Sequence, residues 1–590
     1  MSARSAVRAM DTRRRVALAL VLAALLVFGG RLVQIQAVEG PVLAQEAQDL
    51  RTRTTTLAAP RGEILDASGE VLATSVTRYN VGVNQQLVRG FVPSDPDLAE
   101  EIGSGAAAAA ALLAPVLGAD PHELGARMVG ESTFVYLARG LTPAEWREVS
   151  NLGIPGIEPE RTSERVYPNG TTAGNVIGYV GREGHGLAGL ELTMDELLTG
   201  EDGYRTVEIG KLGEVIPTGL REEVPARPGA SVHSTIDRDL QNVAQEAIDS
   251  AVAEHGGQWG ALIVEEIGTG RVLALADSGS VDPGNYQAWD PEDRGSRAIS
   301  TPYEPGSTGK LPTFLLALEQ GLIGPESSMT VPDRYTTSNG QTFRDNDDHP
   351  TLRLTATGAL QMSSNTATVQ LAEAMTDADR HAMFMDLGFG VRSGIELPGE
   401  SSGIVHAHEN WDGRTRYTTS FGQGISSTLL QNTSMAATIG NGGVYVPPRI
   451  VGGVTNPDGT YVPAEQPEGV EVASAEATED LLAMMEYVVH PTGTGPQGAV
   501  PGYRVAAKTG TAQIPDGAGG LEGRLGSFVG VAPAEDPQLA IGVVVFQGSG
   551  PSYGGTVAGP AFAEVMGFAL RDRGVPPSTE PTPELAIEVG

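Results

Sequence analysis

Residues 304–310 read EPGSTGK, and the lysine that ends this stretch is unusual in this chain. The chain has 39 basic side chains among its 590 residues, but only three are lysines, at positions 211, 310 and 508. Elsewhere it uses arginine, which cannot lose its proton in a protein. A lysine whose pKa is lowered can act as a base. We therefore expect Lys310 to have a chemical function that arginine could not perform.

The residues around Lys310 predict a helix that begins close to Ser307. Pro302 and Pro305 precede the apolar run LPTFLLALEQG, and proline is tolerated at a helix start but not in its interior. Ser307 and Lys310 are three residues apart and would share one helix face. A serine hydroxyl is a poor nucleophile unless a base removes its proton, which a neutral Lys310 could do. Alone the Ser-x-x-Lys pattern is weak, because serine is common.

The second lysine with a suggestive setting is Lys508, in YRVAAKTGTAQ (503–513). The apolar residues before it predict a strand. Lys508, Thr509 and Thr511 would offer an ammonium group, hydroxyls and backbone N–H groups to an anionic substrate terminus. An ordinary strand that ends in a turn at Gly510 would explain the same residues.

A third pattern, QMSSNTATVQ (361–370), lies between the two lysines and predicts a helix. It contains Ser363 and Asn365 in a Ser-x-Asn arrangement, which by itself is a common helix cap. Ser-x-x-Lys, Ser-x-Asn and Lys-Thr-Gly in this order form the motif trio of penicillin-binding proteins and serine β-lactamases. The three together predict a serine enzyme of that superfamily.

The composition argues against several other classes of function, including nucleic-acid binding and metal-dependent chemistry. The net charge of −34 argues against a nucleic-acid partner, since no basic surface is available to displace counterions. Cysteine is absent, which excludes disulfides and Cys-ligated metals, and the nine histidines form no His-x-x-x-His pair. We therefore expect no metal and no cofactor. The length exceeds what one hydrophobic core supports, so two or more domains are expected.

The N-terminus predicts a membrane segment. Residues 1–15 carry five arginines, and residues 16–30 carry no charge. At about 1.5 Å per residue these fifteen residues span roughly 22 Å, short of a bilayer core, unless the helix continues to Val38 and Arg31 snorkels. A cleaved signal peptide is the alternative, but RLVQIQAVEG contains no Ala-x-Ala-like site. We expect an uncleaved anchor at 16–38, with residues 1–15 cytoplasmic and the rest outside the membrane.

Further elements follow from local patterns. We expect a polar stalk at 39–60 and a Pro- and Glu-rich disordered tail at 573–590. The pair Glu265 and Glu266 is expected at the surface, whereas Arg61 and Asp66 are expected to have structural roles. Predicted strands are 79–84, 261–266, 270–277 and 539–547, and predicted helices are 103–118, 239–255 and 560–570.

Over roughly residues 55–572 the sequence resembles the class B penicillin-binding proteins. Plain β-lactamases lack an anchor and a pedestal, and class A enzymes carry a glycosyltransferase domain whose signature is not found here. The context DNDDHPTLRLTATGALQMSSN and the length of the pedestal are similar to the division-type, FtsI-like branch. The matching segments are RGEILDASGEVLA (61–73), ERVYPNG (164–170), GLAGLELTMDELLTGEDG (186–203), YEPGSTGK (303–310), GQGISSTLLQ (422–431), NGGVYVPP (441–448), AAKTGTAQ (506–513) and SFVGVAPAEDPQLAIGVVV (527–545).

This resemblance implies a multi-domain α+β fold. One transmembrane helix would be followed by an elongated α+β pedestal of the dimerisation type at 39–225. A transpeptidase domain at 226–572 would contain an antiparallel sheet flanked by helices and an all-helical subdomain.

The resemblance also implies a D,D-transpeptidase that cross-links peptidoglycan in the septum. Ser307 would attack the penultimate D-Ala carbonyl of a stem peptide, and Lys310 would accept its proton. Ser363 would relay that proton to the leaving D-Ala, and Asn365 would orient the donor peptide. Lys508 would supply a second cation that holds Lys310 near neutrality.

The remaining implied roles concern substrate and partners. Thr509, Gly510 and Thr511 would bind the terminal carboxylate, and the backbone N–H groups of Ser307 and Thr511 would form the oxyanion hole. An amine of a second strand would resolve the acyl-enzyme, and β-lactams would acylate Ser307. A separate membrane glycosyltransferase and division proteins are the expected partners. A D,D-carboxypeptidase, an elongation-type transpeptidase and a largely non-catalytic scaffold or sensor remain alternatives.

Two residues depart from the expected pattern at the start of the active-site helix. Position 309 is glycine, where many relatives have a larger residue, and Pro312 follows in the next turn. Glycine within a helix is less favourable than alanine by about 1 kcal/mol. We therefore expect an irregular helix start around Ser307.

Overall fold

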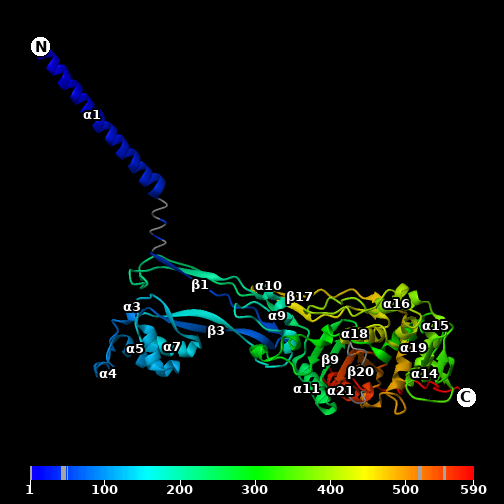
Figure 1. Ribbon diagram of the computed structural model, residues 1–590. Coiled ribbons are helices and arrows are strands. Elements are labelled where there is room, and N and C mark those ends of the chain that lie inside the picture. Colours follow the sequence, from blue (N-terminus) through cyan, green and yellow to red (C-terminus); the bar gives the residue numbers. More distant parts are fainter. Residues whose placement is uncertain are drawn as a thin grey trace. The chain divides into compact units, whose positions relative to one another are not determined.

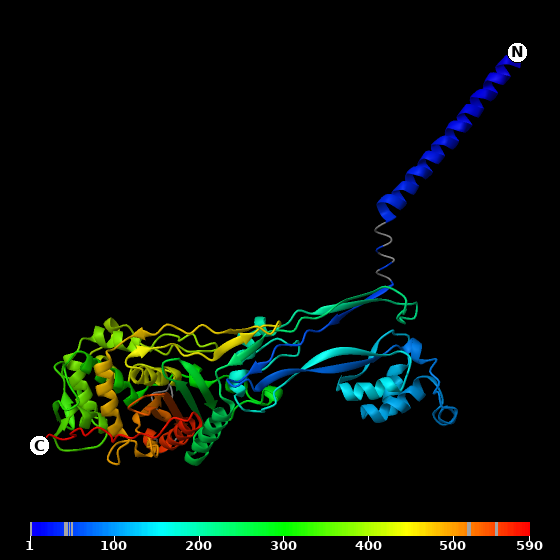
Figure 2. The same cartoon turned by 180° about the vertical axis from the view of Figure 1, so that it is seen from behind.

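The structure is a computed structural model and describes residues 3–40, 45, 48, 51–515, 521–548 and 553–589. Figures 1 and 2 show its elements from opposite sides. Two compact units can be distinguished: the first comprises Met1–Ala59, Thr77–Glu164 and Glu201–Arg227, and the second comprises Pro60–Val76, Arg165–Gly200 and Pro228–Gly590. Parts of the predicted pedestal thus group with the second unit, and the predicted domain boundaries stay a prediction.

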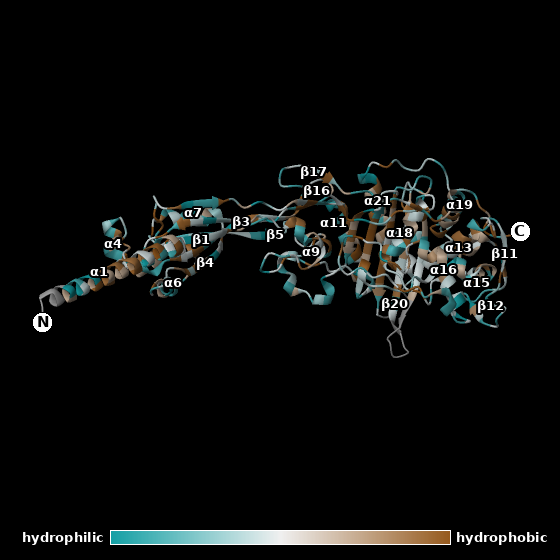
Figure 3. Ribbon diagram, turned by 90° about the horizontal axis from the view of Figure 1, so that it is seen from above, coloured by the Kyte–Doolittle hydropathy of each residue, from teal (hydrophilic) through white to brown (hydrophobic). Residues whose placement is uncertain are grey.

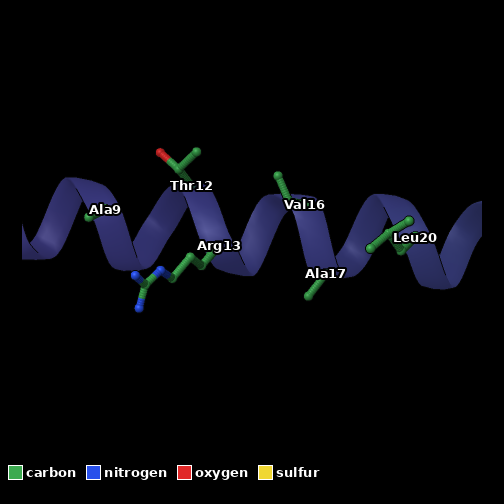
Figure 4. Close-up of a pocket in the computed structure, with 6 residues that line it drawn as sticks. All are labelled: Ala9, Thr12, Arg13, Val16, Ala17 and Leu20. Atoms are coloured by element: carbon green, nitrogen blue, oxygen red, sulfur yellow. The ribbon is translucent and has the colours of Figure 1, made fainter.

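The first unit begins with α1 (Ala3–Val33), which continues as a π-helical segment, Gln34–Glu39. Within the described residues, Arg8–Glu39 is the one unbent helical stretch long and apolar enough to cross a membrane, and none of its most apolar window is buried. The face drawn in Figure 4, which runs from Ala9 to Leu20, is likewise open. The bent pair α4 (Pro96–Ile102) and α5 (Gly105–Leu117) is together also long and apolar enough to cross a membrane, but α5 packs in the core of this unit.

The rest of the first unit contains a small sheet and a helical core. Residues 52–57 of the predicted stalk form β1, whereas its residues 41–44, 46–47 and 49–50 lie outside the described residues, and the stalk stays a prediction. β-branched threonines, which favour strands, supply most of β1. The predicted Ala-rich helix is confirmed as α5, which ends at Gly118 in a left-handed cap. The sheet consists of β1 (Thr52–Leu57), β6 (Gly203–Glu208) and β7 (Arg221–Val224). The hydrophobic core is formed by part of β3 (Val71–Val83), β4 (Val135–Leu141), α5, α6 (Pro121–Met128) and α7 (Pro143–Asn151).

A five-stranded antiparallel sheet forms the centre of the second unit. Its strand order is β10–β9–β21–β20–β19, and the predicted hairpin and last strand are confirmed as β9, β10 and β21. Figure 3 shows many hydrophobic residues along the described parts of these strands, and their buried side chains pack into clusters with helices. The strands are β9 (Trp259–Glu266), β10 (Arg271–Asp277), β19 (Ala506–Pro515), β20 (Leu521–Ala532) and β21 (Leu539–Gln547).

Helices cover this sheet and form a separate cluster beside it. The predicted helices α11 (Arg238–His255) and α21 (Gly559–Asp572) share one hydrophobic cluster with strand residues such as Leu262 and Val543. Another cluster joins α18 (Leu429–Gly440) to the helical subdomain. The predicted fold class is therefore confirmed. The helices of the subdomain are α13 (Lys310–Glu319), α14 (Ala356–Gln361), α15 (Asn365–Ala374), α16 (Asp377–Asp386) and α19 (Ala475–Met485).

Arg61 has the structural role predicted for it. It donates to the fully buried carboxylate of Glu191 at 2.6 Å and to Asp195 at 2.6 Å, and Arg165 donates to the other oxygen of Glu191 at 2.7 Å. Asp66 accepts hydrogen bonds from the backbone of the turn that follows it. These pairs tie together segments of the second unit that lie far apart in the sequence.

The prediction that Glu265 lies at the surface is wrong. Its side chain is 1% exposed, because β9 lies inside the sheet with strands on both sides and α18 against it. The hydroxyl of Ser434 donates to the Glu265 carboxyl at 2.8 Å, and burial raises the pKa of Glu265 to about 8. This carboxyl is therefore mostly neutral at pH 7.

The prediction of a disordered tail at 573–590 is wrong for the tail segment, residues 574–589; Gly590 lies outside the described residues. The segment forms a β-bridge between Glu588 and Leu354 of β14 (Leu352–Thr355), and Leu585 packs against the subdomain core. Its last residues, LAIEV at 585–589, place the larger apolar side chains Leu585, Ile587 and Val589 at every second position, which suits an added strand. The free edge of β14 supplied a partner that the composition of the tail did not reveal.

Candidate active site

Ser307 lies on a 3-10 turn, Gly306–Gly309, that leads directly into α13. The expected irregular helix start is thus observed. The turn packs tightly against β19, since a Cβ on Gly306 would lie 2.5 Å from the carbonyl oxygen of Thr511. Gly510 of β19 is equally restricted, with Pro305 O 2.9 Å from where its Cβ would lie. The glycines therefore let the serine turn approach the strand that carries Lys508.

Gly309, the departure noted in the sequence, also has a steric reason. A Cβ at this position would lie 2.6 Å from the Cα atom of Gly422 and 3.1 Å from its nitrogen. Backbone cannot yield as a flexible side chain can, so a larger residue would displace the turn. Pro312 causes no break, because it lies in the first turn of α13, where its missing N–H has no helical partner.

Lys310 is completely buried, and its amine points to two serines. Its Nζ donates to the hydroxyl of Ser307 at 3.1 Å and to the hydroxyl of Ser363 at 3.0 Å, and it also bonds to the backbone carbonyl of Ser363. Burial lowers the pKa of Lys310 to about 7, although the negative charge of Asp345 opposes this shift. A substantial share of Lys310 is thus neutral near pH 7 and able to accept a proton.

Ser363 follows α14 and adopts a backbone conformation that is rare for serine. Its φ angle is +58°, in the left-handed region, which costs about 1–3 kcal/mol for a residue with a side chain. Such strain is concentrated at functional sites. Here it aims the Ser363 hydroxyl at the two buried lysines.

Lys508, on β19, completes the cluster. Its Nζ donates to the Ser363 hydroxyl at 3.0 Å and to the backbone carbonyl of Thr509 at 3.0 Å. Burial, followed by repulsion from the charge of Lys310, lowers the pKa of Lys508 well below its ordinary value. The two amines share one hydroxyl, so a proton on either one disfavours a proton on the other.

The remaining predicted site residues surround this cluster. Asn365 begins α15, and its side-chain amide donates to the carbonyl of Arg344 at 3.1 Å. The hydroxyl of Thr509 lies 2.8 Å from that of Thr494, whereas Thr511 is half-buried on β19. The structure therefore brings Ser307, Lys310, Ser363 and Lys508 into one hydrogen-bonded chain and holds Asn365 beside it.

Sequence reasoning missed Asp345. Its carboxylate accepts from the backbone nitrogens of Asn365 at 2.5 Å and Thr366 at 2.9 Å and from the hydroxyl of Ser364 at 2.7 Å. It therefore fixes the N-terminus of α15, where an anion is favoured by the helix dipole. The run of acidic residues before His349 was a signal, but acidic side chains near a turn are usually at the surface. Within the described residues no group of His, Asp or Glu side chains is arranged to hold a metal ion.

The Ser307 hydroxyl is thus bonded to one buried lysine and the Ser363 hydroxyl lies between two, which places a possible base next to a possible nucleophile. Residues 260–567 match the model of the penicillin binding protein transpeptidase domain, and residues 56–234 match that of the penicillin-binding protein dimerisation domain. The chain belongs to the class B penicillin-binding proteins.

Individual relatives agree with this assignment over nearly the whole chain. The chain is 34% identical to penicillin-binding protein PbpB of Mycolicibacterium smegmatis, covering 96% of this chain and 91% of that protein. It is 32% identical to peptidoglycan D,D-transpeptidase FtsI of Escherichia coli, covering 94% and 91% respectively. Penicillin binding protein 3 of Mycobacterium tuberculosis, solved in complex with ampicillin, has a TM-score of 0.70 and 29% identity over 91% of this chain and all of that one.

Proposed function

We propose that the chain is a membrane-anchored peptidoglycan D,D-transpeptidase that works through an acyl-enzyme on Ser307. The observation that carries this proposal is the hydrogen-bonded chain from the Ser307 hydroxyl through Lys310 and Ser363 to Lys508. The name of the FtsI relative, a peptidoglycan D,D-transpeptidase, supports the same reaction.

Acylation begins at the Ser307 hydroxyl. Neutral Lys310 accepts its proton while the oxygen attacks the penultimate D-Ala carbonyl of a stem peptide. The backbone N–H groups of Ser307 and Thr511 stabilise the resulting oxyanion, each such donor being worth about 3–4 kcal/mol in comparable sites. The C–N bond then breaks, and the terminal D-Ala leaves with a proton delivered through the Ser363 hydroxyl.

Substrate binding uses the residues next to this chain. The hydroxyls of Thr509 and Thr511, with Gly510 between them and the amine of Lys508 nearby, hold the terminal carboxylate of the donor. The amide of Asn365 orients the donor peptide. An amine from a neighbouring strand attacks the ester, so Ser307 is released and an amide cross-link forms. A β-lactam acylates the same serine, in keeping with the ampicillin complex of the M. tuberculosis relative.

The cellular setting follows from α1 and from the relatives. The apolar helix anchors the protein in the cell membrane, with residues 1–15 in the cytoplasm and the pedestal (39–225) and transpeptidase domain (226–572) outside. The similarity to FtsI and PbpB supports a role in septal wall synthesis. A separate membrane glycosyltransferase supplies the glycan strands, and division proteins hold the enzyme in place.

Product analysis tests this proposal. The purified full chain in detergent is supplied with uncross-linked glycan strands, made from lipid II by a separate glycosyltransferase. We expect cross-linked muropeptides together with one released D-Ala per cross-link, and neither from Ser307→Ala. Release of D-Ala without cross-links would indicate a carboxypeptidase, and neither product would indicate a scaffold.

A further inference from the structure

The end of the tail segment runs antiparallel along the edge of β14, which pairs on its other side with β11 (Ser328–Val331), and forms a β-bridge to it. Opposite Leu354, the N–H of Val589 donates to the carbonyl of Arg353 at 3.0 Å, and the N–H of Thr355 donates to the carbonyl of Ile587 at 3.1 Å. These paired bonds fix the register of residues 585–589 against β14.

The same tail residues touch the first turn of α14. The Thr355 hydroxyl donates to the carbonyl of Ala586 at 2.6 Å and accepts from the N–H of Gly358 at 3.0 Å, which caps the helix. A Cβ on Gly358 would lie only 2.0 Å from the carbonyl oxygen of Ile587. The strand therefore lies directly on the helix, and glycine makes the contact possible.

The other end of α14 holds the strained active-site serine. The N–H of Ser363 donates to Leu360 at 3.0 Å, and the N–H of Ser364 donates to Ala359 at 3.0 Å. α14 is only six residues long, which is less than two helical turns, so its two ends move together as one rigid unit. A displacement at Gly358 is thus expected to reach Ser363, whose left-handed conformation persists only while its surroundings enforce it.

Separate contacts hold the tail segment itself in place. The Tyr487 hydroxyl accepts from the N–H of Leu585 at 2.6 Å and donates to the carbonyl of Pro583 at 2.8 Å. The N–H of Ala586 donates to Glu326 at 3.0 Å. These bonds hold the strand before its contact with α14, and the bond from Val589 to Arg353 holds it after that contact.

We propose that residues 585–589 form a positioning strand that holds α14 and thereby keeps the Ser363 hydroxyl between Lys310 and Lys508. This inference rests on the proposed function, because its effect is on formation of the acyl-enzyme. The hydrogen bonds of residues 585–589 are with β14, Tyr487 and Glu326 and not with a predicted site residue.

The first test is a full chain shortened to end at Glu584, compared with wild type by acylation with a fluorescent penicillin. Stopped-flow measurements separate the dissociation constant of the non-covalent complex from the rate constant of the covalent step. We expect the covalent step to slow at least tenfold, since Ser363 is displaced. The dissociation constant should stay within twofold, because the proposed carboxylate-binding residues of β19 do not contact the tail. Circular dichroism at the assay temperature establishes that the variant is folded.

The second test keeps the whole chain and displaces the strand by Gly358→Ala. The matched control is Gly324→Ala, where a Cβ would meet nothing within 4 Å. Gly358→Ala should slow the covalent step as the shortening does, and the control should not. In the shortened chain the added methyl group has room, so combining both changes should give no further loss.

A folded shortened chain with the covalent rate of wild type would overturn the proposal, as would losses that multiply in the combined variant. If the shortened chain does not fold, Gly358→Ala decides alone, and a wild-type rate for it refutes the positioning strand. Failure of the proposed function looks different, because wild type itself would then form no penicillin adduct.

Discussion

Lys310 and Lys508 share one hydrogen-bond acceptor: the Nζ atom of each lies 3.0 Å from the hydroxyl oxygen of Ser363. Both side chains are fully buried, on different elements of the second unit. Two ammonium groups so placed would repel each other strongly, and burial disfavours each charge. The arrangement therefore favours a state in which one amine is neutral, which is what a base for Ser307 requires.

Lys310→Arg should abolish acylation although the positive charge is kept. Arginine stays protonated in a protein and cannot accept the Ser307 proton. We expect the rate of fluorescent penicillin labelling to fall at least about 100-fold, the usual contribution of a general base. Lys211→Arg is the matched control, since Lys211 is exposed in the turn between β6 and β7. Wild-type labelling of the Lys310 variant would refute the assigned role.

Acylation should depend on pH through the Lys310 amine. Its pKa is lowered by burial to about 7, and the neutral form is the active one. The acylation rate should therefore fall about tenfold per unit as the pH drops below 7 and level off above it. Because the charge of Asp345 raises the pKa of Lys310, Asp345→Asn should move this midpoint to lower pH. A rate that is constant between pH 5 and pH 9 would contradict the assignment.

Gly309→Ala should distort the serine turn. The added methyl carbon would lie 2.6 Å from Gly422 Cα, so the backbone must shift. We expect a loss of about 1–3 kcal/mol in the free energy of unfolding, typical of overpacking, and slower acylation. Gly295→Ala serves as the control, since a Cβ there meets nothing within 4 Å. Thermal unfolding and labelling kinetics measure both effects, and an unchanged Gly309 variant would show that the contact is not restrictive.

Glu191→Gln should destabilise the protein without removing a group of the active site. Glu191 is fully buried between Arg61 and Arg165, and the substitution removes the charge that both guanidinium groups share, so that Arg61 keeps only Asp195. Breaking a buried pair of this kind costs about 3–5 kcal/mol. The exposed pair of Arg205 and Glu223 provides the control, and Glu223→Gln should cost less than about 1 kcal/mol. Equal shifts in Tm for both variants would argue against a special role of the buried cluster.

Much of the site was predictable because its residues belong to short sequence motifs. The scarcity of lysine singled out Lys310 and Lys508, and apolar patterning placed β9, β10, β21 and α11 with only small errors at their ends. The proximity of Lys310 and Lys508 was implied by the family resemblance alone, because the local patterns do not show how β19 packs against the helical subdomain.

The errors have a common physical cause, which is that long-range contacts override local composition. The tail looked disordered because proline and glutamate dominate its beginning, yet the edge of β14 orders its last residues. Glu265 looked exposed because it stands near a turn, yet its strand lies inside the sheet. Gly309 was expected to destabilise the helix start, yet the backbone of Gly422 leaves no room for a side chain at that position. Except for β10, which neighbours Glu265 in the hairpin, these partners lie far away in the sequence.

Mass spectrometry of the intact chain after reaction with benzylpenicillin tests the central assignment most directly. Wild type should gain the mass of one penicilloyl group, and proteolysis should place it on the peptide that contains Ser307. The Ser307→Ala variant should gain none while keeping the Tm of wild type within a few degrees. An adduct on another residue, or an adduct that survives Ser307→Ala, would contradict Ser307 as the nucleophile.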